Sequence, residues 1–145
     1  MEHQPYCSTF LVRQAWLSMR AAVGEELSGH DLSVAQYAAL WIVGQHPGVP
    51  IAELARWMGS TRQSANELLA ALERDGLLER RPHATDRRAR QVWLTDTGRD
   101  RFTAAEPAVL AMEERLSVGF DAAERAVVRR WLAQMSAASP DTGAS

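Results

Sequence analysis

The sequence predicts a mainly α-helical protein with one small β-hairpin, an α+β arrangement dominated by helices. Three features indicate this class: stretches with apolar residues at helical spacing, a short helix-breaker-helix segment, and two apolar segments around an arginine-rich loop. A chain of 145 residues can bury one core but is short for two domains. We therefore expect residues 1–145 to form a single domain with a disordered tail at 138–145.

Two helices are expected ahead of the helix-breaker-helix segment. The first lies within residues 7–29, and its apolar side chains cover more than one stripe, so it needs more than one packing partner. The second begins at Ser33, which forms a capping-box pattern with Gln36, and ends near Gly44. A cluster of helix breakers at 46–50 then separates this helix from the next one.

The segment from Pro50 onward is expected to form two short helices that cross sharply. Pro50 suits a first helical position, and the apolar residues after it recur at helical spacing. Gly59 can adopt the positive φ that ends a helix, and Ser60 or Thr61 can cap the next helix. This second helix extends to about Asp75, buries one apolar face and is polar on the other face near its N-terminal end.

The polar N-terminal end of the second helix is a candidate for contacts with DNA base edges. Arginine pairs with guanine, and glutamine or asparagine pairs with adenine, through two hydrogen bonds in the major groove. Serine and threonine at the helix start can act only as caps, or can also bind a phosphate. The candidate DNA-binding residues of this helix are Ser60, Thr61, Arg62, Gln63, Ser64 and Asn66.

A β-hairpin with a long basic tip is expected after Gly76, with strands at 77–81 and 91–94. Five arginines and one aspartate between positions 80 and 90 give a formal charge of about +4, whereas the whole chain carries −2. Such a hairpin beside two crossing helices makes residues 33–95 a winged helix-turn-helix region. The candidate phosphate neighbours in it are Arg80, Arg81, Arg87 and Arg90.

The helices on either side of this region have apolar faces that one subunit cannot cover. We expect the helices within 7–29 and 96–137 to pair with the same helices of a second copy about a two-fold axis. A two-fold homodimer places two recognition helices in successive major grooves, about 34 to 36 Å apart. The expected partner is therefore double-stranded DNA that carries an inverted repeat.

The sequence from Leu54 to Gly98 also resembles a known family. It follows the pattern LAxxMGxxRxSxxxLLxxLExxGLLxRRPxxxDRRARxVxLTxxG, which is similar to the MarR family of dimeric bacterial transcription regulators. The resemblance implies that Asp86 orients Arg88 and that Arg88 enters the minor groove, although Asp86 can also be an ordinary turn residue. Glu67 departs from the family, where a basic residue is common, so the operator sequence cannot be inferred from relatives.

The resemblance further implies a transcription regulator, most often a repressor, that a small and possibly aromatic ligand releases from DNA. It places that ligand between the dimerisation helices and the winged region, near Trp16, Tyr37 and Trp41. From the residues alone, we expect most of the large aromatic side chains to belong to the core. One branch of the family senses peroxides through an N-terminal cysteine, so a thiol-responsive regulator acting through Cys7 is an alternative.

Composition excludes several other classes. A single cysteine permits no internal disulfide, the histidines lack metal-ligand spacing, and no cofactor is expected. No long apolar stretch or signal peptide is evident, which predicts a cytoplasmic protein without membrane contact. The sequence shows no paired nucleophile and base of the kind that would indicate an enzyme. A winged-helix module that binds another protein in place of DNA is the second alternative.

Overall fold

The computed structural model describes residues 7–86 and 90–138, and its architecture confirms the predicted fold class. Helices dominate, and three short strands form a small antiparallel sheet. In chain order the elements are α1 (Ser8–Leu27), the 3-10 helix η1 (Ser28–His30), α2 (Val34–Gln45), β1 (Val49–Pro50), α3 (Ile51–Trp57), α4 (Arg62–Arg74), β2 (Leu78–Pro82), β3 (Arg90–Leu94), α5 (Asp96–Leu116) and α6 (Ala122–Ala137).

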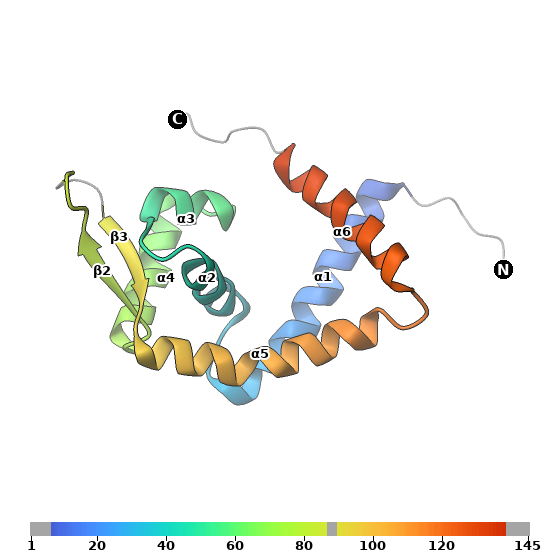
Figure 1. Cartoon of the computed structure of the whole chain (residues 1–145), viewed down its shortest axis with the longest axis horizontal. Helices are drawn as coiled ribbons and strands as arrows, with labels where there is room; N and C mark the ends of the chain where they lie inside the picture. The colour runs from blue at the N-terminus through green and yellow to red at the C-terminus, as the bar shows by residue number, and fades with distance from the viewer. Residues whose placement is uncertain (1–6, 87–89, 139–145) are drawn as a thin grey trace.

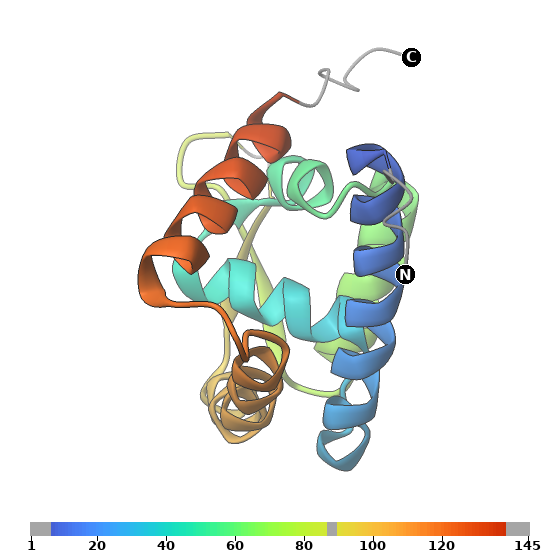
Figure 2. The same ribbon diagram turned by 90° about the vertical axis from the view of Figure 1, so that its right-hand side faces the viewer.

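The elements gather into a winged unit and a set of outlying helices (Figure 1). The winged unit holds α2, α3, α4 and the sheet, and α5 leads away from the end of β3 toward α6. Figure 2 shows α1 and α6 on opposite sides of that view, and Figure 1 shows α2 in the winged unit, to the left of both. The outlying helices α1, α5 and α6 therefore lie beside the winged unit.

The sheet contains one strand that the sequence pattern did not indicate. Its order is β1-β3-β2, with both pairs antiparallel, and Val49 of β1 lies opposite Val92 of β3. Pro50 belongs to β1 and is the N-cap of α3, with ψ at 145°, so its expected place as the first helical residue is wrong. A strand of two residues gives no alternating pattern, and only its pairing with β3 reveals it.

The hydrophobic core joins the winged unit to the end of α1 and the middle of α5. Its fully buried large side chains come from five elements and one loop, and each contributes roughly 1.5 to 3 kcal/mol through removal from water. They are Leu27, Leu40, Val43, Leu54, Leu69, Leu72, Leu77 and Val92. Because this core holds α3, α4 and the sheet together, it determines how the helices and the wing face a ligand.

Side-chain caps start α2, α4, α5 and α6. Ser33 and Gln36 form the complete capping box of α2, and Thr95 caps α5 by accepting from the Gly98 amide at 3.0 Å. Gly98 lies against Leu77, since a Cβ at position 98 would stand 1.9 Å from the Leu77 carbonyl oxygen. The first turn of α5 can approach the end of α4 this closely only without a side chain.

Helix α6 has no buried residue among those that the structure describes. Its apolar side chains are exposed except for the half-buried Met135, with Val127 52%, Trp131 43% and Leu132 41% exposed. The helix is attached at its start, where Arg125 pairs with Glu114 at 2.8 Å and donates to the Phe120 carbonyl oxygen. Large apolar residues are also exposed along α1 and at the end of α5, among them Phe10, Leu11, Trp16, Leu17, Leu110 and Leu116.

Candidate nucleic-acid interface

The turn between α3 and α4 presents the N-terminal end of α4 to solvent. Gly59 adopts a φ of 60°, and the next residue, Ser60, donates its amide to the Ala55 carbonyl oxygen at 3.0 Å. Of the two residues that could cap α4, Thr61 is the cap, because its hydroxyl oxygen accepts from the Ser64 amide at 3.1 Å. The side chains of Arg62, Gln63 and Ser64 are exposed at this helix end.

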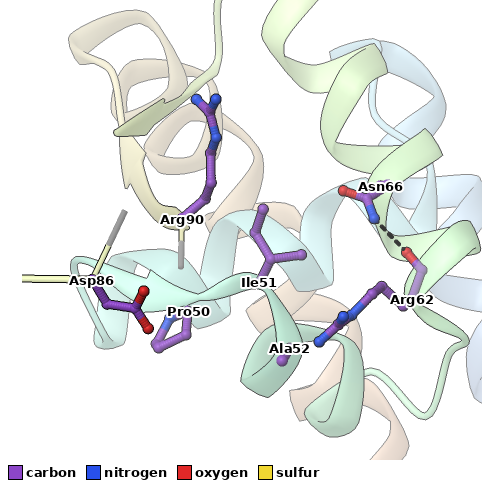
Figure 3. A pocket seen from close by; sticks show the side chains of 7 residues that line it. All are labelled: Pro50, Ile51, Ala52, Arg62, Asn66, Asp86 and Arg90. Carbon is purple, nitrogen blue, oxygen red and sulfur yellow. Dashed lines mark hydrogen bonds between the residues drawn. The ribbon is translucent and has the colours of Figure 1, made fainter. Parts of the chain in front are cut away.

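A hollow of about 410 Å³ lies between the starts of α3 and α4 and the wing. Pro50, Ile51 and Ala52 form its floor at the start of α3, and Figure 3 shows Arg62 and Asn66 on one side and Asp86 and Arg90 on the other. Two guanidinium groups and one carboxylate thus border the same hollow. The sequence alone did not indicate that these two segments, 20 to 28 residues apart, meet around the start of α3.

Asn66 is partly buried, unlike its exposed neighbours Arg62, Gln63 and Ser64 at the start of α4. Its amide oxygen accepts from Arg80 Nη1 at 3.1 Å, and its Nδ2 donates to the Arg62 carbonyl oxygen at 2.9 Å. Arg80 Nε also donates to a carboxylate oxygen of Glu73, and the Arg80 side chain is only 24% exposed. The guanidinium group of Arg80 therefore faces the recognition helix, and these contacts do not favour its expected place beside a phosphate.

Glu67, the acidic residue of the recognition helix, has a polar neighbour one turn earlier. Gln63 donates to a Glu67 carboxylate oxygen at 3.4 Å, and both residues are exposed. This contact is long for a hydrogen bond and lies at a solvent-exposed surface, so it is readily exchanged for another partner. The two side chains can therefore rearrange when a ligand approaches this end of the helix.

Arg81 lies on the other face of the sheet from the core. Its guanidinium carbon stands 4.9 Å from the centre of the Trp93 ring, and one of its nitrogens pairs with a Glu79 carboxylate oxygen. The Trp93 ring in turn covers Gly48, where an added Cβ would lie 2.8 Å from it. Arg81 is 55% exposed, so it is held in place but still reaches solvent at the base of the wing.

A histidine organises the described part of the wing tip. His83 Nδ1 accepts hydrogen bonds from the backbone amides of Thr85 and Asp86, both at 3.2 Å. An accepting Nδ1 carries no proton, so the ring is in the tautomer with its proton on Nε2. Sequence reasoning had assigned no role to His83. Arg87 and Arg88, predicted for phosphate and minor-groove contacts, lie outside the described residues.

The aromatic residues expected in the core are mostly at the surface of the single chain. Trp16 is 56%, Trp41 48% and Trp57 40% exposed, so that expectation is wrong. Tyr37 is partly buried and stacks on Phe102 with 5.0 Å between ring centres. Burial raises the pKa of the Tyr37 phenol, and the nearby carboxylates of α5 raise it further. The spacing of the aromatic residues along the helices could not distinguish a face that packs in the core from a face exposed to solvent.

Cys7 is the exposed N-cap residue of α1. Its sulfur lies 2.7 Å from the Thr9 hydroxyl oxygen. Hydrogen bonds from Thr9 and from the Phe10 and Thr9 amides lower the pKa of this thiol below 9.0. The sequence analysis did not identify the Thr9 hydroxyl, two residues away, as a partner of this thiol.

Two further properties of the described residues bear on other classes of protein. Within residues 7–86 and 90–138, no three His, Cys, Asp or Glu side chains gather closely enough to hold a metal ion. Across the same described residues, no helix is long and apolar enough to cross a membrane.

The crossing helices α3 and α4, the three-stranded sheet and the basic loop define a winged helix-turn-helix protein. A sequence profile of the MarR family matches residues 30–89. The transcriptional regulator HosA of Escherichia coli O127:H6 is 31% identical over 105 residues, which cover 72% of this chain and 78% of HosA. The chain therefore belongs to the MarR family of transcriptional regulators, whose members are not enzymes.

Two other similar proteins are described as repressors. The repressor Rv2887 of Mycobacterium tuberculosis H37Rv is 29% identical over 126 residues, which cover 87% of this chain and 91% of Rv2887. The structure of the transcriptional repressor CouR bound to a 23-mer DNA duplex superposes with a TM-score of 0.80 at 27% identity, and covers 88% of this chain and 91% of CouR. All three relatives are thus transcription regulators, and CouR is seen bound to DNA.

Proposed function

We propose that this chain is a homodimeric repressor that binds an inverted repeat in double-stranded DNA. The observation that carries the proposal is the hollow between α3, α4 and the wing, where Arg62 and Arg90 border a surface open to a ligand. Arginine binds phosphate and guanine in paired hydrogen bonds. The description of Rv2887 and CouR as repressors supports repression as the outcome of binding.

The residues divide into two roles in this proposal. Arg62 and Gln63 contact base edges in the major groove, with Asn66 behind them at the hollow. The backbone amides in the first turn of α4, near Thr61 and Ser64, favour binding of a phosphate at the helix N-terminus. Ser60 lies in the turn just before this helix end. Around the wing, Arg88 enters the minor groove beside Asp86, and the phosphate neighbours are Arg81, Arg87 and Arg90.

The apolar helices support a dimer. Residues 7–29 and 96–137 carry exposed apolar side chains on α1, α5 and α6, which a second copy covers by two-fold pairing. An amphipathic helix without a buried side is costly to leave in water, since each covered large apolar side chain is worth roughly 1.5 to 3 kcal/mol. Residues 33–95 then serve as the DNA-binding region, with half-sites about 34 to 36 Å apart.

The proposal includes release by a small aromatic ligand that binds between the dimerisation helices and the winged unit. Exposed Trp16 and Trp41 and partly buried Tyr37 lie on α1 and α2 and offer aromatic surface there. Such a ligand acts only if it binds better to a form whose recognition helices do not match the groove spacing. Titration of simple aromatic acids into the protein–DNA complex tests this step, and undiminished DNA binding in all of them counts against it.

The test of the function is selection of duplexes from a random DNA library at constant salt. Wild type should enrich an inverted repeat, and Arg62→Ala and Arg88→Ala should enrich it less, because each loses contacts worth about 1 to 3 kcal/mol. Arg99→Ala is the matched control, since Arg99 lies in the first turn of α5, at the end of β3 away from the wing tip. Salt is held constant because phosphate contacts make affinity steeply salt-dependent.

The outcomes separate the alternatives. Enrichment by wild type and by Arg99→Ala, but not by the other two variants, supports a sequence-specific regulator. Equal, sequence-independent binding by all four proteins overturns the proposal and favours a winged-helix module that binds another protein.

A further inference from the structure

Arg80 connects the wing to the recognition helix at two places. Its Nε donates to Glu73 in the last turns of α4, and its Nη1 donates to Asn66 Oδ1 in the first turns, at 3.1 Å. Asn66 and Glu73 are seven residues apart, so they lie on the same face of the helix. One guanidinium group of β2 therefore spans about two turns of the helix that carries the proposed base contacts.

The same contact decides which way the Asn66 amide points. An arginine can only donate, so the atom of Asn66 that faces Arg80 must be the amide oxygen. The amide nitrogen then faces the Arg62 carbonyl oxygen, which can only accept, at 2.9 Å. Asn66 retains one N–H and one lone pair for a further partner, and it lines the hollow beside Arg62 (Figure 3). Its donor and acceptor are thus preset before any ligand arrives.

We propose that Arg80 is a positioning residue for DNA recognition, which holds the wing against α4 and presets the Asn66 amide for a base edge. The inference rests on the proposed function and adds a determinant of specificity to it. Arg80 is 24% and Glu73 33% exposed, so the ion pair is shielded in part from solvent. A side chain engaged in this way is a poor phosphate ligand, since binding a phosphate would first require it to leave both partners.

A phosphate contact and a positioning role for Arg80 predict different dependence of DNA affinity on salt concentration. A phosphate contact adds about 0.9 to the slope of log affinity against log salt, so its loss in both subunits lowers the slope by about 2 on every DNA. A positioning residue leaves the slope unchanged. Its loss weakens binding to the selected operator while binding to an unrelated duplex of the same length stays the same, so the specificity ratio falls.

The experiment measures affinity of the full-length protein for both duplexes at four salt concentrations. We expect Arg80→Met to lower the ratio of operator to unrelated affinity by at least about tenfold, the factor that 1.4 kcal/mol represents. Arg80→Lys can keep one of the two contacts and should fall between Arg80→Met and wild type. The matched control is Arg74→Met, because Arg74 is an exposed arginine at the end of the same helix and should leave the ratio unchanged.

Two further variants keep the inference testable if Arg80→Met folds poorly. Glu73→Gln removes a negative charge, so electrostatics alone predicts tighter binding to any DNA, whereas loss of positioning predicts a lower ratio. Asn66→Ala should relax base preference at the same operator position as Arg80→Met. The double variant should then lose less than the sum of the two single losses, because residues that act as a unit are not additive.

Three results would overturn the inference. They are an unchanged ratio in Arg80→Met and Glu73→Gln, a slope reduced by about 2 in Arg80→Met, or fully additive effects of Arg80→Met and Asn66→Ala. A wild-type protein that prefers no sequence would instead overturn the proposed function, and this inference with it.

Discussion

Replacement of Gly98 by alanine tests the closest approach between two elements of the fold. The Cβ of an alanine at this position would lie 1.9 Å from the Leu77 carbonyl oxygen and 2.8 Å from its carbonyl carbon. Both are backbone atoms, which cannot rotate away as a side chain can. The start of α5 must therefore move away from the segment that follows α4.

The size of the effect follows from the contacts that this movement breaks. A carbon and an oxygen approach to about 3.3 Å at best, so α5 must shift by more than 1 Å. The shift breaks the bonds from the Thr95 amide to Leu77 O, at 3.2 Å, and from the Thr95 hydroxyl to Gly76 O, at 2.5 Å. Two hydrogen bonds at about 1 kcal/mol each and a weakened cap at about 1 kcal/mol lower the free energy of unfolding by roughly 2 to 3 kcal/mol.

Urea unfolding at one protein concentration measures this loss. With a slope of about 1 to 3 kcal/mol per molar urea, the midpoint of Gly98→Ala should fall by about 1 M or more. Gly24→Ala is the matched control, because Gly24 lies inside α1 with only Val34 nearby, at 3.7 Å. Alanine there should raise stability by about 1 kcal/mol through helix propensity. A Gly98→Ala midpoint equal to that of wild type would refute the argument from Leu77.

Two further predictions concern the exposed helices. Leu132→Glu should convert a dimer into monomers, because two copies each lose about 1.5 to 3 kcal/mol of apolar burial. Sedimentation measures the molecular mass in solution, and a mass equal to that of the wild-type dimer would contradict the proposed interface. Cys7 should react with iodoacetamide with a midpoint pH below that of an ordinary thiol, since the bond from Thr9 favours the thiolate and lowers its pKa. Thr9→Val should move that midpoint upward, and identical pH profiles for the two proteins would show that Thr9 has no such effect.

Local chemistry made much of the fold predictable from the chain. The capping box at Ser33 and the positive φ at Gly59 each depend on one residue and its immediate neighbours, and the structure has both. Apolar residues at helical spacing gave the helices, and the family pattern gave the winged unit. These features need no information about distant parts of the chain.

The same local patterns could not say what an exposed side chain touches. Arg80 and Arg81 are neighbours in one basic segment, yet Arg80 faces α4 while Arg81 lies over Trp93. The sequence analysis likewise expected most large aromatic side chains in the core, yet Trp16 and Trp41 are exposed in the single chain. Both outcomes depend on which surface lies opposite, and that surface comes from elsewhere in the chain or from another copy.

The sequence by itself determined the presence of the helices, the basic hairpin and the family, because each is recorded in residues close together along the chain. Only the tertiary structure decided that β1 completes the sheet, that Gly98 must be glycine because Leu77 lies against it, and that Asn66 is held by Arg80. The physical reason is that pairing, close approach and hydrogen-bond partners are properties of distance in space, which folding sets by packing one core.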